Sequence, residues 1–372
     1  MLVCGALVMA ALAAQTSTAP SASATPAPSA AATSSAPGNA APGTDGASVP
    51  VAPVARRHGR LVGDVMVDLI LMLDADASAE VSAGHADAAF AELARVQAAF
   101  DPDGPGIGAI NRSAGGEAVL MDPEVFAVLV EIDRIARLSR GAFDPTAAAY
   151  ASLWTDGDVP AAVTLKARRA VVGLSQLVLD PVRRTARLVS RGARIDVAAV
   201  ARGYGLDRAR GILIERGVKA FVLSGNGDLV VHGDKAGAPW MVGVQDPRAA
   251  GPFLTIALNP LVLGGAVMTA ADTDGAIVVD GQRRHRQLDP KTGLPARLVR
   301  SATVLDSDAL TAACLARAIF VMGPREGLDL AARLKGPEVV VVGADNRVSL
   351  SPGLKKLQAS GGLKQRQPTD GP

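Results

Sequence analysis

The stretch QRRHRQLDPKTGLPA, at residues 282–296, encodes a short rigid turn beside a cluster of basic side chains. Pro290 fixes its own φ, Gly293 permits a positive φ, and Pro295 stops any helix. The backbone of this stretch is therefore strongly determined by its own residues.

Outward from the turn, hydrophobic periodicity predicts helices in groups and consecutive strands joined by short turns. Helices are expected over 79–100, 123–139, 199–216, 309–321 and 324–334. Strands are expected over 65–72, 177–180, 185–189, 220–223, 229–232, 240–244, 254–258, 276–280, 302–305 and 339–342. This order predicts an α+β fold with largely antiparallel sheets rather than a doubly wound parallel sheet.

The first residues, MLVCGALVMAALAA at 1–14, form an apolar run that is too short to span a bilayer. The run ends in small residues with an A-x-A pattern at Ala11–Ala13, which is typical of a signal peptide. A basic segment before the run is missing, so a start further upstream or an uncleaved anchor are alternatives. We expect a bacterial protein that is exported to the periplasm, with tethering to the inner membrane as a variant of this expectation. A cytosolic chain with a disordered tail is the competing interpretation.

Composition divides the rest of the chain. Residues 15–56 are almost entirely Ala, Ser, Thr, Pro and Gly, which predicts a disordered linker because such a segment buries little apolar surface. Residues 57–356 are expected to form one domain, and the polar residues 357–372 are expected to be a disordered tail.

Charge and cysteine content exclude some classes of function. Lys and Arg total 38 against 36 Asp and Glu, and aromatic residues make up 3% of the chain, so neither a basic nucleic-acid surface nor a stacking platform is expected. Cys4 and Cys314 are the two cysteines. Cys314 lies in an apolar helical pattern, which favours a small buried side chain over a disulfide.

Three polar segments admit both a structural and a functional interpretation. SGNGD, at 224–228, is a hairpin signal or a backbone cradle for a ligand. In IDVAAVARGYGLDRA, at 195–209, Asp196 is a helix cap or a ligand group, and Arg202 is a candidate cation for a diphosphate. In GAFDPT, at 141–146, Asp144 is an ordinary turn residue or part of a ligand rim.

Together these segments resemble the FAD:protein FMN transferase family, the ApbE-type proteins, over about residues 60–335. The remaining segments follow in family order: INRSAG at 110–115, WMVGVQDP at 240–247, VMTAAD at 267–272, LDPKTG at 288–293 and ALTAACLARAIFVMG at 309–323. The resemblance implies an α+β fold with a nucleotide pocket between lobes. It also implies binding of FAD and Mg²⁺, and transfer of FMN to a Thr or Ser of an acceptor flavoprotein in a membrane electron-transfer complex, with release of AMP.

The resemblance also assigns site residues by position. The flavin would be contacted by Phe100, Ala142, Phe143 and Asp144, and the nucleotide by Asp196 and Arg202. Gln287 would contact FAD, and the backbone carbonyl of Ala199 would be a metal ligand.

Several catalytic positions of the family carry other residues here. Arg286 stands where the family has a histidine, and Ala313 and Arg317 stand at metal positions but cannot ligate an ion. Arg317 either marks a pocket that has lost its function or places a fixed cation where Mg²⁺ would sit. An active protein would use His285 as the base, with Arg202 and Arg317 supporting the diphosphate. The competing interpretation is a non-catalytic flavin-binding protein or scaffold beside an electron-transfer complex.

Overall fold

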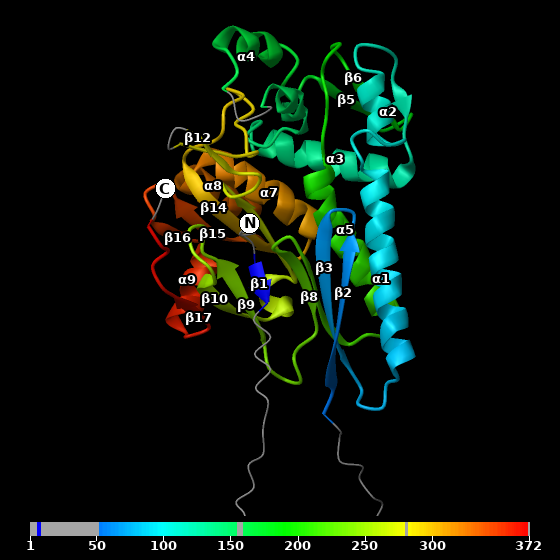
Figure 1. Cartoon of the computed structure of the whole chain (residues 1–372), viewed down its shortest axis with the longest axis vertical. Helices are drawn as coiled ribbons and strands as arrows, with labels where there is room; N and C mark the ends of the chain where they lie inside the picture. The colour runs from blue at the N-terminus through cyan, green and yellow to red at the C-terminus, as the bar shows by residue number, and fades with distance from the viewer. Residues whose placement is uncertain (1–5, 9–51, 155–158, 280–281, 371–372) are drawn as a thin grey trace, which may run out of the picture.

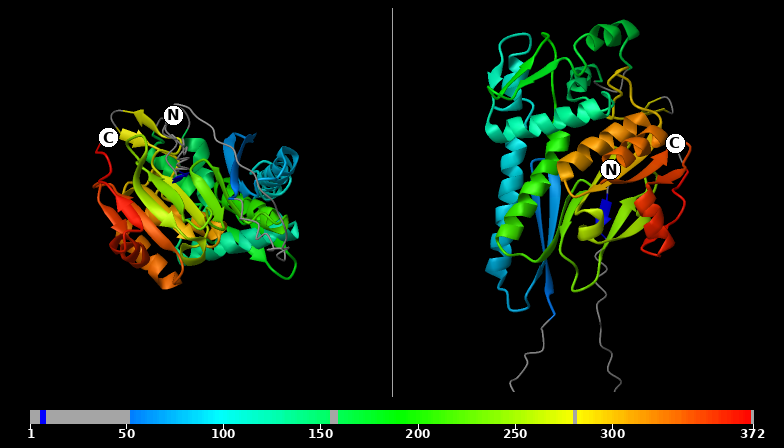
Figure 2. Two further views of the ribbon diagram at one scale, coloured as in Figure 1. Left: turned by 90° about the horizontal axis from the view of Figure 1, so that it is seen from below. Right: turned by 180° about the vertical axis from the view of Figure 1, so that it is seen from behind.

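A computed structural model of the chain describes residues 6–8, 52–154, 159–279 and 282–370 (Figure 1). Helices cover one face of a large sheet, and a smaller sheet covers the other face (Figure 2). The helices are α1 (Ala79–Ala99), α2 (Ile107–Arg112), α3 (Pro123–Leu138), the 3₁₀ helix η1 (Pro145–Leu153), α4 (Ala162–Arg169), α5 (Ala198–Glu215), α6 (Pro260–Leu263), α7 (Ala309–Met322), α8 (Pro324–Leu334) and α9 (Pro352–Ala359).

The large sheet has eight strands in the order β16-β15-β14-β11-β8-β7-β3-β2, and every neighbouring pair is antiparallel. Its strands are β2 (Val54–Val62), β3 (Val65–Leu73), β7 (Ala220–Gly225), β8 (Asp228–His232), β11 (Ala266–Ala271), β14 (Val299–Asp306), β15 (Glu338–Gly343) and β16 (Val348–Leu350). The second sheet pairs β1 (Ala6–Val8), β9 (Trp240–Gln245), β10 (Pro252–Leu258) and β17 (Leu363–Gln365). Smaller sheets contain β4 (Val119–Leu120), β5 (Leu177–Asp180) and β6 (Thr185–Leu188), and β12 (Ile277–Val279) with β13 (Gln282–Arg284).

Two separate cores follow from the alternation of side chains along the central strands. Phe221 and Leu223 of β7 point into the core beneath the helices, whereas Val222 points toward the four-stranded sheet. In β15, Val341 and Val342 divide between the two cores in the same way. Strands buried on both faces read as continuous apolar runs, so their alternation is invisible in the sequence. The predicted α+β class with largely antiparallel sheets is confirmed.

Five of the ten described helices begin at a residue whose side chain accepts from a free amide of the first turn. Ser78 accepts a hydrogen bond from the Val81 amide at 3.3 Å before α1, and Asp308 accepts from Thr311 at 2.7 Å before α7. Asp122 caps α3, which has Pro123 in its first turn. These signals explain why the helix starts could be predicted from the sequence alone.

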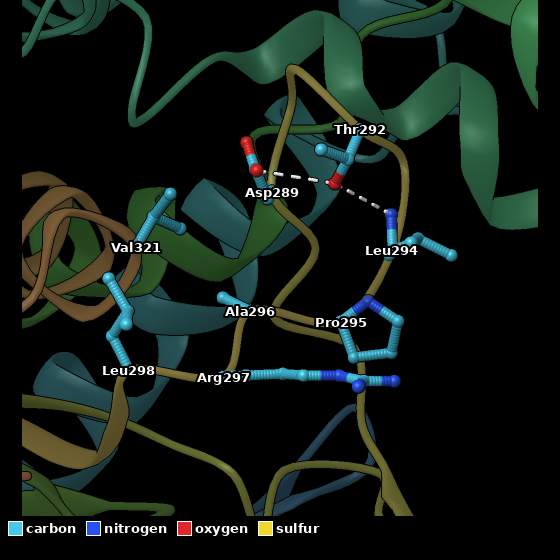
Figure 3. Close-up of a pocket in the computed structure, with 8 residues that line it drawn as sticks. All are labelled: Asp289, Thr292, Leu294, Pro295, Ala296, Arg297, Leu298 and Val321. Atoms are coloured by element: carbon cyan, nitrogen blue, oxygen red, sulfur yellow. Dashed lines mark hydrogen bonds between the residues drawn. The ribbon is translucent and has the colours of Figure 1, made fainter. Parts of the chain in front are cut away.

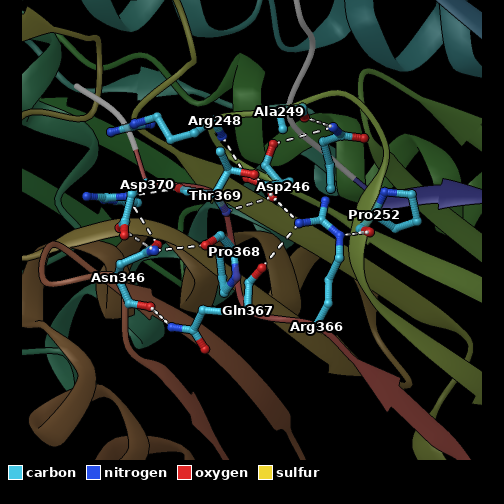
Figure 4. Close-up of polar contacts among 12 residues, drawn as sticks. Asp246, Arg248, Ala249, Pro252, Asn346, Arg366, Gln367, Pro368, Thr369 and Asp370 are labelled. Carbon is cyan, nitrogen blue, oxygen red and sulfur yellow. Dashed lines mark hydrogen bonds and ion pairs between the residues drawn. The ribbon is translucent and has the colours of Figure 1, made fainter.

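The structure differs from the expectation at the C-terminus. Instead of a disordered tail over 357–372, α9 runs to Ala359, β17 pairs with β10, and the chain continues to Asp370 as an ordered strap. Figure 4 shows that this strap, residues 366–370, crosses the loop after β9. Polar tail residues are held here by hydrogen bonds rather than by apolar burial, so hydropathy gave no signal for them.

Asp246 is the centre of the strap's contacts, and its side chain is fully buried at 0% exposure. Its carboxylate accepts hydrogen bonds from the Thr369 amide and hydroxyl, both at 2.9 Å, and pairs with Arg366 at 2.9 Å. Asn346 donates to the Pro368 carbonyl at 2.8 Å. The strap therefore fastens the end of the chain to both sheets.

At the N-terminus, Val54–Arg56 belong to β2, so the expected linker over 15–56 extends too far. Residues 15–51 of that expected linker lie outside the described residues. Residues 6–8 of the predicted signal-like segment form β1, which pairs with β9, and the other residues of 1–14 are not described. Among the described residues, no helix combines the length and the apolarity that a membrane crossing requires.

Candidate functional site

The LDPKTG turn is closed by its own side chains. The Asp289 carboxylate accepts hydrogen bonds from the Lys291 amide at 2.9 Å and from the Thr292 hydroxyl at 3.2 Å. The Gly293 amide donates to the Asp289 carbonyl at 2.8 Å, and Gly293 has the positive φ, 74°, that the sequence predicted. Figure 3 shows the turn beside a hollow of about 320 Å³ that also touches Val321 of α7.

The 3₁₀ helix η1, which begins at the end of the GAFDPT segment, packs directly against this turn. Tyr150, fully buried in η1, donates from its hydroxyl to the Pro290 carbonyl at 3.2 Å, and Trp154 donates from Nε1 to the Gly293 carbonyl at 2.9 Å. Asp144 begins η1 by accepting from the Thr146 amide at 2.8 Å and its hydroxyl at 2.6 Å. Burial raises the pKa of Asp144, and the bonds from Thr146 oppose that rise. Two predicted motifs far apart in sequence thus form one unit.

Replacing Trp154 with Phe removes the hydrogen bond to the turn but keeps an aromatic ring. We expect the free energy of unfolding to fall by about 1 kcal/mol, the net value of a typical hydrogen bond. Urea denaturation followed by circular dichroism measures this change. An unchanged midpoint would mean that the indole contributes nothing to holding the turn.

Helices α5 and α7 approach each other closely at Gly203. A Cβ at this glycine would lie 2.4 Å from the Ala309 carbonyl oxygen and 3.2 Å from the Cβ of Ala313. Ala313 is therefore buried in the helix contact, at 1% exposure. Arg202 precedes Gly203 in α5, and Arg317 lies one turn after Ala313 in α7. The contact between Gly203 and Ala313 therefore brings the two arginines near each other.

The carboxylates of Asp228 and Asp274 lie near these two arginines. We call the four residues Arg202, Arg317, Asp228 and Asp274 the charge cluster. Burial raises the pKa of Asp228, which the guanidinium groups of Arg202 and Arg317 oppose. Burial is the largest effect that lowers the pKa of Arg317, and the neighbouring Arg202 lowers it further. Asp228 and Asp274 oppose this shift. The cluster therefore gathers charges of both signs, with Asp228 buried and the other three side chains partly exposed.

Among the described residues, neither guanidinium group of the cluster is hydrogen-bonded to a carboxylate of the cluster. Arg317 donates to the Ala313 carbonyl at 3.4 Å, and Arg202 makes no hydrogen bond with any described residue. The Nε of Arg202 is buried and unpartnered. Asp228 instead accepts from the Thr269 amide at 2.9 Å, and Asp274 accepts from Gln287 at 3.1 Å. Buried donors without partners are rare in proteins, so a bound water, ion or ligand would be needed to satisfy the Arg202 Nε.

The side chains of His285 and Arg286 differ in burial: His285 points into the protein and Arg286 points to solvent. Their adjacent positions in the sequence predict this difference. His285 is buried, with Nε2 3.0 Å from the Ala296 carbonyl oxygen and its ring edge-on to Phe320. Nε2 is the donor because a carbonyl only accepts, which leaves Nδ1 as a buried acceptor that has no partner in the described part of the chain. Burial lowers the pKa of His285. Arg286 is exposed and packs over Gly275.

The other predicted site residues lie around these features. Phe100 is buried in the core with its ring edge-on to Tyr204, rather than open to a pocket. Asp196 accepts from the amide of Ala198, the first residue of α5, at 2.9 Å, although the N-cap residue is Val197 and not Asp196. Ala199 lies in the first turn of α5, and Ala142 and Phe143 are buried just before η1. Gln287 joins the charge cluster through Asp274. Their contacts with a flavin remain predictions.

Sequence reasoning did not select Asp228 or Asp274. Asp228 follows a two-residue hairpin loop, Asn226-Gly227, in which both residues have positive φ. The turn interpretation of SGNGD is therefore correct, and it also places Asp228 at the start of β8. The signal that could have identified Asp228 is an ionisable residue at the start of an otherwise apolar strand. Asp274 lies in a turn, and the sequence carries no such signal for it.

The residues around the cluster do not fit a Mg²⁺ ion. Magnesium takes oxygen ligands in an octahedral arrangement, whereas Ala313 and Arg317 of α7 carry no side-chain oxygen. Within the described ranges, no group of three or more His, Cys, Asp or Glu side chains converges on one point. Two guanidinium groups beside Asp228 and Asp274 also oppose a further divalent charge.

Fold and site together define an α+β protein in which two guanidinium groups and two carboxylates lie near one another between the helices and the large sheet. The chain matches the model of the ApbE family over residues 65–341 and belongs to that family. It is 27% identical over 244 residues to the FAD:protein FMN transferase of Vibrio cholerae, covering 63% of this chain and 72% of that protein. It is 28% identical over 273 residues to the enzyme of the same name from Treponema pallidum, covering 68% and 74%.

Solved structures agree with this assignment. The crystal structure of the ApbE protein from Thermotoga maritima matches with a TM-score of 0.73 at 27% identity, covering 82% of this chain and 99% of that one. The flavin transferase ApbE from Vibrio cholerae matches in fold with a TM-score of 0.70 at 22% identity. The family predicted from the sequence is thus confirmed, and it is a family of flavin transferases.

Proposed function

We propose that this protein binds FAD with its diphosphate at the charge cluster and transfers the FMN half to a Thr or Ser hydroxyl of an acceptor flavoprotein. The observation that carries the proposal is the pair of neighbouring guanidinium groups, Arg202 and Arg317, whose donors are largely uncommitted. Guanidinium groups suit phosphates because they donate two parallel hydrogen bonds. The relatives named FAD:protein FMN transferase supply the reaction class.

In this reaction the acceptor hydroxyl oxygen forms a bond to the phosphorus of the FMN half. The bond from that phosphorus to the bridging oxygen breaks, and AMP leaves with the bonding electrons. The two arginines would stabilise the charge that develops on the phosphate oxygens. Asp274 is the partly exposed carboxylate of the cluster, so we assign it to take the hydroxyl proton. His285, held by Ala296, would first have to leave its buried position.

Replacing Asp274 with Asn tests the assigned base. We expect the rate of flavin transfer to fall roughly 100-fold or more, the usual range for loss of a general base, while FAD still binds. Transfer is measured as covalent flavin fluorescence on a co-purified acceptor after denaturing electrophoresis. Asp329→Asn, an exposed acid on α8, is the matched control and should transfer at the normal rate. Equal rates in the two variants would remove Asp274 from the mechanism.

A second candidate is a non-catalytic flavin-binding protein. It is favoured by Arg286 in the place of the family's histidine and by the buried, engaged ring of His285. The same gel separates the two candidates. An acceptor that is labelled by a family relative but never by this protein, although this protein binds FAD, would favour the second.

The cellular setting is also part of the proposal. The apolar run at 1–14 supports export to a bacterial periplasm, with tethering to the inner membrane as an alternative. The acceptor would then be an exposed flavoprotein of a membrane electron-transfer complex. Fractionation of cells that produce the full chain, followed by immunoblotting, tests the compartment.

A further inference from the structure

We infer that the charge cluster binds the FAD diphosphate without a divalent metal, with Arg317 supplying the positive charge from the protein itself. This inference rests on the proposed function and deepens it. It starts from the observation that Ala313 and Arg317 of α7 offer no side-chain oxygen that could bind a magnesium ion.

The position of Arg317 is fixed by packing. Ala313, one turn earlier, is pressed against α5 beside Gly203, where the two helices are too close for a side chain on the glycine. Because α7 is buried along most of its length, the backbone at Arg317 is held beside the cluster. A cation supplied from a backbone that is already in place loses less conformational freedom when an anion binds, which favours binding.

The charges of the cluster give a second argument. Arg202 lies close enough to Arg317 to disfavour the charge of Arg317, and Asp228 and Asp274 oppose this effect without forming an ion pair within 4.0 Å among the described residues. A diphosphate between the arginines would receive hydrogen bonds that the carboxylates do not take. A divalent ion would instead add to the repulsion.

The test is a titration of FAD, followed by flavin fluorescence anisotropy, in excess EDTA and again with excess Mg²⁺. We expect the two dissociation constants of the full chain to agree within about 2-fold, and inorganic pyrophosphate to displace FAD in EDTA. Binding that requires Mg²⁺ would overturn the inference and leave the proposed function standing. Absence of FAD binding under both conditions would overturn the proposed function as well.

Variants sharpen this test. Arg317→Ala should weaken binding at least 10-fold in EDTA, corresponding to the loss of one charge-assisted contact, and Arg317→Lys should fall between it and the wild type. The double variant Ala313→Asp with Arg317→Thr places oxygen ligands one helical turn apart, so its FAD binding should become dependent on Mg²⁺. Arg325→Ala, an exposed arginine on α8, is the control and should bind like the wild type. If Arg317→Ala, folded by circular dichroism, binds FAD normally in EDTA, Arg317 is not the replacement cation.

Discussion

Gly203→Ala is expected to lower the free energy of unfolding by roughly 1–3 kcal/mol, the usual cost of overpacking a tight core. The added methyl group would lie 2.4 Å from the Ala309 carbonyl oxygen, a backbone atom that cannot rotate away. Helix α7 would therefore have to shift against α5. Urea denaturation at equilibrium measures the loss.

Gly211→Ala is the matched control because it lies in the same helix with no atom within 4 Å of its added Cβ. Alanine is the better helix former, so this variant should gain up to about 1 kcal/mol. The two substitutions should thus have opposite signs. Equal effects would contradict the close contact between α5 and α7, and with it the placement of Arg202 beside Arg317.

Asp246→Ala is expected to cost roughly 2–3 kcal/mol, because a buried carboxylate that accepts several hydrogen bonds is lost and its donors remain unpaired. The Thr369 amide and hydroxyl and the Arg366 guanidinium would lose this partner. The strap over 366–370 should then be cleaved readily by carboxypeptidase, which is followed by mass spectrometry. Asp329→Ala, an exposed acid, is the control, and equal cleavage of both variants would show that Asp246 does not hold the strap.

The same carboxylate predicts a dependence on pH. Burial on its own would raise the pKa of Asp246, but the hydrogen bonds from Arg248, Thr369 and Arg366 together lower it below its usual value. Its contribution is therefore complete above the unfolded pKa of about 3.9 and is lost as the pH falls through the lower folded pKa. The stability difference between the wild type and Asp246→Asn should shrink below about pH 4. A difference that is constant with pH would contradict this.

The sequence determined the features that depend on near neighbours in the chain. Pro290 and Gly293 specify the LDPKTG turn, Asn226 and Gly227 specify a hairpin loop, and the caps before α1 and α7 specify helix starts. Local sterics and short-range hydrogen bonds act on the same residues that carry the signal, so no tertiary contact is needed to predict them. The order of the motifs was also sufficient for the family.

Only the tertiary structure decided which of these segments meet. The strap over 366–370 is ordered because Asp246, more than a hundred residues earlier, accepts its hydrogen bonds. Asp228 and Asp274 join Arg202 and Arg317 because β8, β11, α5 and α7 pack together, and no local pattern specifies that packing. Burial of His285 and Phe100 likewise depends on partners distant in the chain, so their surroundings could not be predicted from their neighbours in sequence.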